Sequence, residues 1–224
     1  MILFRTDEKF TNQITFTKEE IEHFRSLRIN DEEKEIEIRD GKGSSYFFQV
    51  GAKSKTGNLI RTETHLINSN KIGVASAIPK SNRLDFLLQK STEIGITHFY
   101  FINFLHSERK EINLDRANKI ILEACSQSKR HTIPTIEVYS SLEKFLLAEK
   151  NIFLLDPKAK KNLKTNSDWS SIPIIGPEGG FRKEELDLLI QANARSFSIQ
   201  ENILRIETAH VFMTSLLSFQ SLSG

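Results

Sequence analysis

The sequence predicts an α/β protein in two parts: a small all-β domain in residues 1–70 and an α/β domain with a mostly parallel sheet in residues 71–224. Two observations predict it. Before residue 70, short segments alternate polar and apolar side chains, which is typical of strands in a small barrel or sandwich. After residue 70, apolar strands alternate with amphipathic helices, which indicates a parallel sheet covered on both faces.

In the first part, turn residues separate three strand-like segments, at residues 35–40, 45–52 and 58–67. One helix is expected among them, at residues 17–27. It begins with the sequence Thr17-Lys18-Glu19-Glu20, in which Thr17 and Glu20 have the spacing of a capping box.

In the second part, strands and helices follow one another to the end of the chain. Strands are expected at residues 72–78, 96–102, 135–139, 151–156, 172–176 and 196–199. Helices are expected at residues 83–94, around 117–125, at 141–149, at 183–191 and from about Glu207. Gly95 is placed to end the first of these helices, and residues 157–171 form a long polar loop.

Composition excludes several classes of protein. A hydrophobic content of 38% with 27% charged residues excludes disorder and low-complexity arrays. The single cysteine, Cys125, cannot form an internal disulfide, and the six histidines lack the ligand spacing of a zinc site, so no metal is expected. No apolar run approaches the roughly 18 residues that span a bilayer, and the first ten residues do not resemble a secretory signal. A soluble, cytoplasmic protein is therefore expected.

Charge neither requires nor excludes a nucleic-acid partner. The formal net charge is +2, with −1 in residues 1–70 and +3 in residues 71–224. Neither part is a polycation, so any nucleic-acid site must be a local patch of cations.

Three loops follow predicted strands at the end of the sheet where ligands bind in open α/β folds, at residues 155–157, 176–180 and 200–205. The middle loop holds three of the chain's ten glycines. Glycine leaves backbone groups open to a ligand, although a plain strand-to-helix turn is the alternative explanation. No dinucleotide or Walker motif is present, and Glu178 would repel a phosphate, so an uncharged or cationic ligand fits better.

Five spaced motifs resemble the RsmE family of small-subunit ribosomal RNA uridine-N3 methyltransferases, within the SPOUT superfamily. In order along the chain they are DFLLQKSTEIGI (85–96), SER (107–109), EACSQSKRHTIP (123–134), IGPEGGF (175–181) and ILRIETA (203–209). A thinner match in the first part comprises HFRSLRI (23–29) and DGKG (40–43).

The resemblance implies a PUA-like β-barrel followed by a SPOUT-type parallel sheet whose C-terminal segment forms a trefoil knot, a rare exception to unknotted chain topology. It also implies a homodimer that binds 16S ribosomal RNA or the small ribosomal subunit, and S-adenosyl-L-methionine as cofactor. The implied cofactor-binding residues are Leu155, Ile175, Gly176, Pro177, Gly179, Gly180, Ile199, Gln200, Ile203, Leu204, Glu207, Thr208 and Ala209.

Methyl transfer from a sulfonium to uridine N3 needs in-line positioning and loss of the N3 proton. Arg205 is the candidate to stabilise the developing anion, with an ion pair to Glu201 or Glu207 as the structural alternative. Glu178 is the weaker candidate to accept the proton. Cys125 is a candidate nucleophile, but its place in an apolar helical stripe favours core packing.

Candidate RNA-binding residues are Arg5, His23, Arg28, Lys90, Arg109, Gln127 and Arg130. Each has a structural alternative: Lys90 has the spacing of a helical pair with Glu93, and Arg109 can form a local turn. Gln127 and Arg130 lie at a helix end, where a cation favourably meets the helix dipole.

Five positions depart from the family pattern. Ile199-Gln200 stand where the family has Leu-Gly, and Asn202 stands where it has arginine. Arg182 replaces a small polar helix start, and Lys129 replaces a glycine. Two alternative functions therefore stay open: a noncatalytic RNA-binding assembly factor, or a SPOUT methyltransferase that acts on a different RNA atom.

Overall fold

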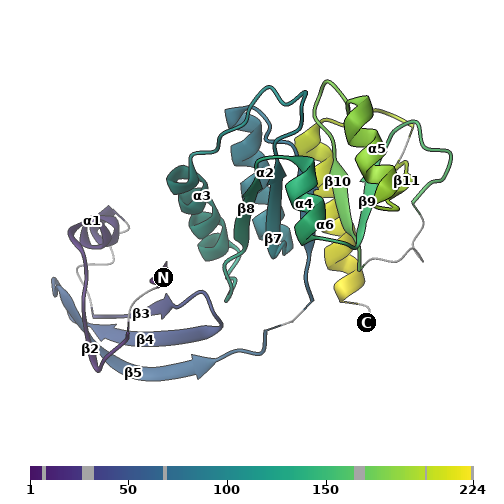
Figure 1. Cartoon of the computed structure of the whole chain (residues 1–224). Helices are drawn as coiled ribbons and strands as arrows, with labels where there is room; N and C mark the ends of the chain where they lie inside the picture. Colours follow the sequence, from purple (N-terminus) through teal and green to yellow (C-terminus); the bar gives the residue numbers. More distant parts are fainter. Residues whose placement is uncertain (7–8, 27–32, 68–69, 164–169, 200, 223–224) are drawn as a thin grey trace. The chain divides into compact units, whose positions relative to one another are not determined.

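The computed structural model describes residues 1–6, 9–26, 33–67, 70–163, 170–199 and 201–222. These residues form two compact units (Figure 1). The first comprises residues 1–69 and 125–133, and the second comprises residues 70–124 and 134–224. The first unit thus includes a short segment from the middle of the chain, which no boundary in the sequence pattern indicates.

The first unit contains one five-stranded sheet in the order β1-β3-β4-β5-β2. Its strands are β1 (Ile2–Phe4), β2 (Gln13–Thr15), β3 (Lys34–Arg39), β4 (Ser44–Val50) and β5 (Thr56–Thr64). β3, β4 and β5 pair antiparallel, while β1 pairs parallel to β3. β1 and β2 were not predicted, because three residues are too few to show an alternating pattern.

Helix α1 (Lys18–Ser26) packs on the core of this sheet. The expected capping box is confirmed: the Thr17 amide donates to Glu20 Oε2 at 2.8 Å, and the Glu20 amide donates to Thr17 Oγ1 at 3.2 Å. The core that helix and sheet share consists of Ile14, Phe16, Ile21, Phe24, Ile36, Ile38, Phe48 and Val50.

The second unit is built on a six-stranded sheet in the order β11-β9-β10-β6-β7-β8, in which each pairing is parallel (Figure 1). The strands are β6 (Gly73–Ser76), β7 (His98–Ile102), β8 (Thr135–Tyr139), β9 (Ile152–Leu155), β10 (Ile172–Ile175) and β11 (Arg195–Phe197). Every residue of β6, β9 and β10 is buried, as expected for strands covered on both faces.

The remaining helices are α2 (Ser81–Ile94), α3 (Leu114–Gln127), α4 (Leu142–Ala148), α5 (Lys183–Gln191) and α6 (Ile206–Ser221). They belong to the second unit, except for the last three residues of α3, which belong to the first. Gly95 ends α2 as predicted, with φ of +121° and its amide bonded to the carbonyls of Ser91 and Thr92. The stripe that predicted α3 is confirmed as core, and Cys125 is fully buried with a pKa raised to about 11 by burial. This thiol is packing material and not an exposed nucleophile. Of the polar loop at 157–171, residues 164–169 lie outside the described part.

Candidate functional site

The three candidate loops follow neighbouring strands. β9 lies between β10 and β11, and parallel strands place their carboxyl ends at the same edge of the sheet. Leu155 and Ile175, the last residues of β9 and β10, are buried there.

Backbone hydrogen bonds join the chain after β9 to the end of β11 and to Ser198, just before the third loop. The Asp156 amide donates to the Phe197 carbonyl at 3.0 Å, and the Ser198 amide donates to the Lys161 carbonyl at 2.9 Å. The Leu163 amide returns a bond of 2.9 Å to the Ser198 carbonyl. Ile199, one residue further, is partly buried, whereas Gln200 lies outside the described residues. The chain after β9 is therefore tied to the residues that lead into the third loop.

The middle loop is a tight turn whose three glycines have separate physical reasons. Gly180 has φ of +73°, which favours glycine, and its amide donates to the Pro177 carbonyl at 2.9 Å. A Cβ at Gly176 would lie 2.6 Å from Cε2 of Phe181, and one at Gly179 would lie 3.2 Å from Cβ of His106. A Cβ at Gly180 would meet no atom within 4 Å, so its backbone is open to an approaching ligand.

Glu185 fixes the start of α5, which follows this turn. This buried carboxylate accepts the Arg182 amide on Oε2 and the Leu105 amide on Oε1, both at 2.8 Å. The side chain of Arg182 makes no cap, as expected for a cation at this position. Through the bond to Leu105, Glu185 holds residues 104–106 against the start of the helix. His106, in this segment, also contacts the middle loop: its Nδ1 lies 3.0 Å from the carbonyl oxygen of Gly180.

The start of α6 carries the second group of candidate cofactor residues. Ile203 is 82% exposed, Leu204 is partly buried, Thr208 is exposed and Ala209 is buried. Glu207 is buried, and its Oε1 lies 3.7 Å from Nε of Arg83 on α2. Its Oε2 is buried and has no hydrogen-bond partner among the residues that the structure describes. A buried carboxylate oxygen in this state is able to accept a bond from a ligand.

The two candidate catalytic residues lie in two of these loops. Glu178 is exposed in the middle loop, and Arg205 is exposed as the residue before α6. Within the described part of the chain neither makes an ion pair, and Glu207 pairs with Arg83 instead of Arg205. The ion-pair alternative for Arg205 with Glu207 is therefore not the arrangement observed.

The candidate RNA-binding residues of the first unit have different surroundings. Arg5 forms a two-bond ion pair with Glu20, at 2.6 and 3.0 Å, and donates to the Thr15 carbonyl. His23 is exposed on α1, and Arg28 lies outside the described residues. Gln127 is exposed at the end of α3, and Arg130 is partly buried three residues later.

In the second unit, Lys90 has the local partner that its spacing suggested, whereas Arg109 bonds to one local and one distant group. Lys90 donates to both carboxylate oxygens of Glu93 at 2.9 Å. Arg109 donates to the Glu111 carbonyl at 2.9 Å and to Ser81 Oγ at 2.7 Å. These bonds order the two side chains and leave their role in RNA binding a prediction.

Two important residues carried no recognisable signal in the sequence. Glu185 resembles any acidic residue in the first turn of a helix. Arg39 continues the alternation of β3 at a position expected to face solvent, yet it is only 4% exposed because residues 125–133 cover it within the first unit. Among the described residues there is no cluster of metal-ligating side chains, and no helix has the length and apolar character needed to span a bilayer.

Comparisons with known proteins agree with this geometry. A family model described as an RNA methyltransferase domain matches residues 67–218. A protein of Bacillus subtilis named Ribosomal RNA small subunit methyltransferase E is 28% identical, covering 92% of this chain and 90% of its own. The protein of that name from Mesomycoplasma hyopneumoniae is 29% identical, covering 95% of this chain and 97% of its own.

Solved structures share the fold. A Ribosomal RNA small subunit methyltransferase E from Neisseria gonorrhoeae, bound to S-adenosyl methionine, has a TM-score of 0.81 at 22% identity over 98% of this chain and 97% of its own. A methyltransferase from Legionella pneumophila in complex with the same cofactor has the same score, identity and coverage. This chain and the two solved structures thus share a small β unit followed by a parallel α/β unit. The knotted C-terminal segment that the motifs imply fits these two neighbours.

Proposed function

The chain belongs to the RNA methyltransferase family, and from this premise we propose that it transfers a methyl group from S-adenosyl-L-methionine to N3 of a uridine in 16S ribosomal RNA. One observation carries the proposal. Curated relatives that align with nearly the whole chain bear the name of the small-subunit enzyme, so the likeness includes both units. The three loops at one sheet edge supply the corresponding site.

The residues at this edge suit the cofactor. S-adenosylmethionine has a cationic sulfur and a cationic amino group, and it supplies a methyl group activated by that sulfur. The backbone of Gly180 is open, and Glu178 and Glu207 bring negative charge to the loops. Oε2 of Glu207, which has no hydrogen-bond partner among the described residues, is a ready acceptor for a cationic or N–H group of a ligand.

The protein contributes to the reaction in two ways: it positions the reacting groups, and it stabilises the charge that develops on the uracil. The loops hold the methyl donor in line with the attacking nitrogen, which converts two bound molecules into one reacting pair. Arg205, exposed beside α6, stabilises the negative charge that develops on the uracil oxygens as the N3 proton leaves. Glu178 accepts that proton.

The RNA is held by cations on both units, with Gln127 and Arg130 as the principal candidates in the first. We place the enzyme in the cytoplasm as a homodimer. The dimer is supported by exposed apolar side chains along one helix, α6: Phe212 is 40% exposed, Phe219 is 66% exposed and Leu222, just after its end, is 81% exposed. Light scattering of the purified chain measures the oligomeric state directly.

Nucleoside mass spectrometry of 16S ribosomal RNA tests the reaction. RNA from a deletion strain should lack N3-methyluridine and regain it on incubation with the purified chain and S-adenosylmethionine. An unchanged level in the deletion strain would contradict the proposal. Loss of a different modified nucleoside would assign the chain to another RNA atom.

Calorimetry with S-adenosylmethionine tests the site independently of RNA. Gly180→Trp should abolish binding, because the indole fills the open space at that backbone. Gly51→Trp is the matched control, since Gly51 is exposed in the other unit and should leave binding unchanged. No binding by well-folded wild-type protein would favour a noncatalytic RNA-binding factor.

A further inference from the structure

The segment after α3 ends the helix in a strained way. The Arg130 amide donates to the Cys125 carbonyl at 2.9 Å, and the Lys129 amide donates to the Ser126 carbonyl at 3.3 Å. These two bonds define a Schellman ending, in which the residue at the position of Lys129 adopts a left-handed backbone and is usually glycine. Lys129 has φ of +57°. A side chain in this conformation costs free energy, so surrounding contacts must hold the turn.

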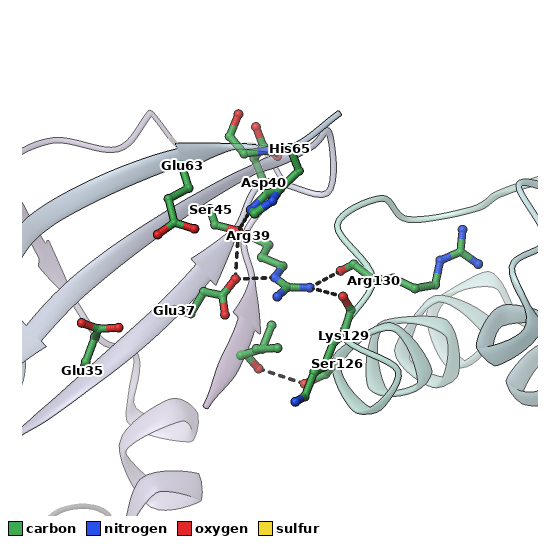
Figure 2. Close-up of polar contacts among 12 residues, drawn as sticks. Glu35, Glu37, Arg39, Asp40, Ser45, Glu63, His65, Ser126, Lys129 and Arg130 are labelled. Atoms are coloured by element: carbon green, nitrogen blue, oxygen red, sulfur yellow. Dashed lines mark hydrogen bonds and ion pairs between the residues drawn. The ribbon is translucent and has the colours of Figure 1, made fainter. Parts of the chain in front are cut away.

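Arg39 supplies the most direct of these contacts (Figure 2). Its Nη1 donates to the carbonyl of Lys129 at 2.6 Å and to the carbonyl of Arg130 at 2.7 Å. Both carbonyls lie just beyond the helix, where backbone oxygens have no partner within the helix. In Figure 2 the Arg130 carbonyl faces Arg39 while its own guanidinium points the opposite way. One buried side chain thus fixes the backbone and leaves the side chain of Arg130 directed elsewhere.

The charge of Arg39 is itself compensated inside the first unit. Its Nε donates to Glu37 Oε1 at 2.6 Å, and Ser45 Oγ donates to the same oxygen at 2.8 Å. Burial opposes ionisation of Glu37, but the hydrogen bonds from Arg39 and Ser45 outweigh it and lower the pKa of this carboxyl below its ordinary value. His65 Nε2 lies 3.1 Å from Ser45 Oγ, so the network continues to the residue after β5. The guanidinium is therefore held in one orientation.

Further contacts from the same unit support the turn. The Gly43 amide donates to the His131 carbonyl at 3.2 Å, and the Ile133 amide donates to the Gly41 carbonyl at 3.2 Å. The rings of His65 and His131 stack with centroids 3.5 Å apart. Arg39 binds the two carbonyls on either side of the α-carbon of Arg130, so it holds the two peptide groups that flank this residue.

We propose that Arg39 is a positioning residue for RNA binding: it fixes the 128–131 turn and thereby sets the side chains of Gln127 and Arg130 for contact with the RNA. The proposal rests on the proposed function, in which those two residues bind ribosomal RNA. Arg39 itself is buried, and it acts through the backbone of the turn.

Steady-state kinetics of Arg39→Met test this role. Methionine keeps most of the side-chain length but removes the charge-assisted bonds to the carbonyls of Lys129 and Arg130, together with the bond to Glu37. We expect KM for RNA to rise about tenfold or more, which corresponds to at least about 1.4 kcal/mol, while kcat and affinity for S-adenosylmethionine stay within about twofold. Arg39→Lys, which keeps a cationic donor, should restore part of the loss.

Arg61→Met is the matched control. Arg61 lies on β5 of the same sheet and pairs with Glu35 and Glu63, but it is exposed and does not contact the turn. Its KM for RNA should not change. An equal rise in both variants would overturn the proposal, because it would reflect general loss of charge from the sheet.

A double-mutant cycle asks whether Arg39 acts through the proposed side chains. In a Gln127→Ala/Arg130→Ala background, Arg39→Met should raise KM by less than about twofold, because the groups that it positions are gone. A full additional rise would overturn the proposal.

Amide hydrogen exchange separates this proposal from the proposed function. Arg39→Met should accelerate exchange at Lys129 and Arg130, whereas Arg61→Met should not. Unchanged amide exchange at Lys129 and Arg130 in Arg39→Met would overturn the positioning role, even if the wild type methylates RNA. A wild type that does not methylate RNA would overturn the proposed function, and amide exchange would still measure the order of the turn. If Arg39→Met does not fold, because Glu37 is left unpaired, Glu37→Gln/Arg39→Met removes both charges and is compared in the same way.

Discussion

The aromatic ring of Phe181 occupies the space beside Gly176 into which a side chain at that position would project. A methyl group at that carbon would come within 2.6 Å of Cε2 and 2.7 Å of Cζ of the ring. Phe181 also meets Phe104 edge-on, with centroids 5.3 Å apart, and Phe104 is 1% exposed. The glycine at the end of β10 thus lets the loop fold back onto the hydrophobic core.

Gly176→Ala should therefore destabilise the protein by about 1–3 kcal/mol, the usual cost of overpacking a core, and weaken binding of S-adenosylmethionine. Urea unfolding and calorimetry measure the two effects. Gly51→Ala serves as the control, because its nearest atom would be Ser54 Cβ at an ordinary 3.9 Å. Equal stability of the two variants would show that the ring moves aside without cost.

Glu185→Gln should loosen the start of α5. The carboxylate accepts two backbone amides, and a glutamine side chain offers one acceptor oxygen, so one buried amide loses its partner. We expect a loss of about 1–3 kcal/mol in the free energy of unfolding. Glu184→Gln, at an exposed position in the same turn, should change it by less than about 0.5 kcal/mol. A small effect at Glu185 would mean that water replaces the carboxylate.

Periodicity was sufficient to predict most elements of the fold. The residues predicted for α5 and β8 match those observed, because each has a clear pattern bounded by turn residues. β1 and β2 were missed because each has three residues. The inclusion of residues 125–133 in the first unit was also missed, since it depends on contacts between residues about 90 positions apart.

In the candidate site, too, local features were predictable from the sequence and long-range contacts were not. The three loops were predictable because strand ends and glycines are local features of the chain. The contacts of Arg39 with the turn and of Glu185 with Leu105 were not, because they join groups 80 to 91 residues apart and nothing nearby in the sequence indicates them. Gln200, where the motifs depart most from the family, lies outside the described residues, so its effect on the cofactor loop stays a prediction.

His210 should make stability depend on pH. It is fully buried on α6, with Nδ1 3.0 Å from Ser91 Oγ, and burial lowers its pKa from 6.5 to about 3. The unfolded chain therefore takes up this proton first as pH falls. The stabilisation is complete above about pH 6.5 and is lost towards pH 3, at up to about 1.4 kcal/mol per pH unit.

Urea unfolding between pH 7 and 5 measures this effect before most carboxylates titrate. His210→Leu, which lacks the titrating group, should show a shallower dependence than the wild type. Contributions from His98 and His131, whose pKa values are also lowered first by burial, are common to both proteins and cancel. Identical slopes would show that the wild-type histidine is hydrated in solution.

Lys129→Gly should stabilise the protein, because it removes a side chain from a left-handed backbone at the end of α3. The strain relieved is about 1–2 kcal/mol, and the greater freedom of glycine in the unfolded chain offsets part of it. We expect a net gain of about 0.5–1 kcal/mol in urea unfolding. Lys129→Ala removes the same exposed ammonium but keeps the strain, so it should give no gain. The two variants differ only by the β-carbon of alanine. Equal stabilities would mean that the turn carries no strain at this position, whereas a gain for glycine alone shows that Lys129 is held in an unfavourable conformation.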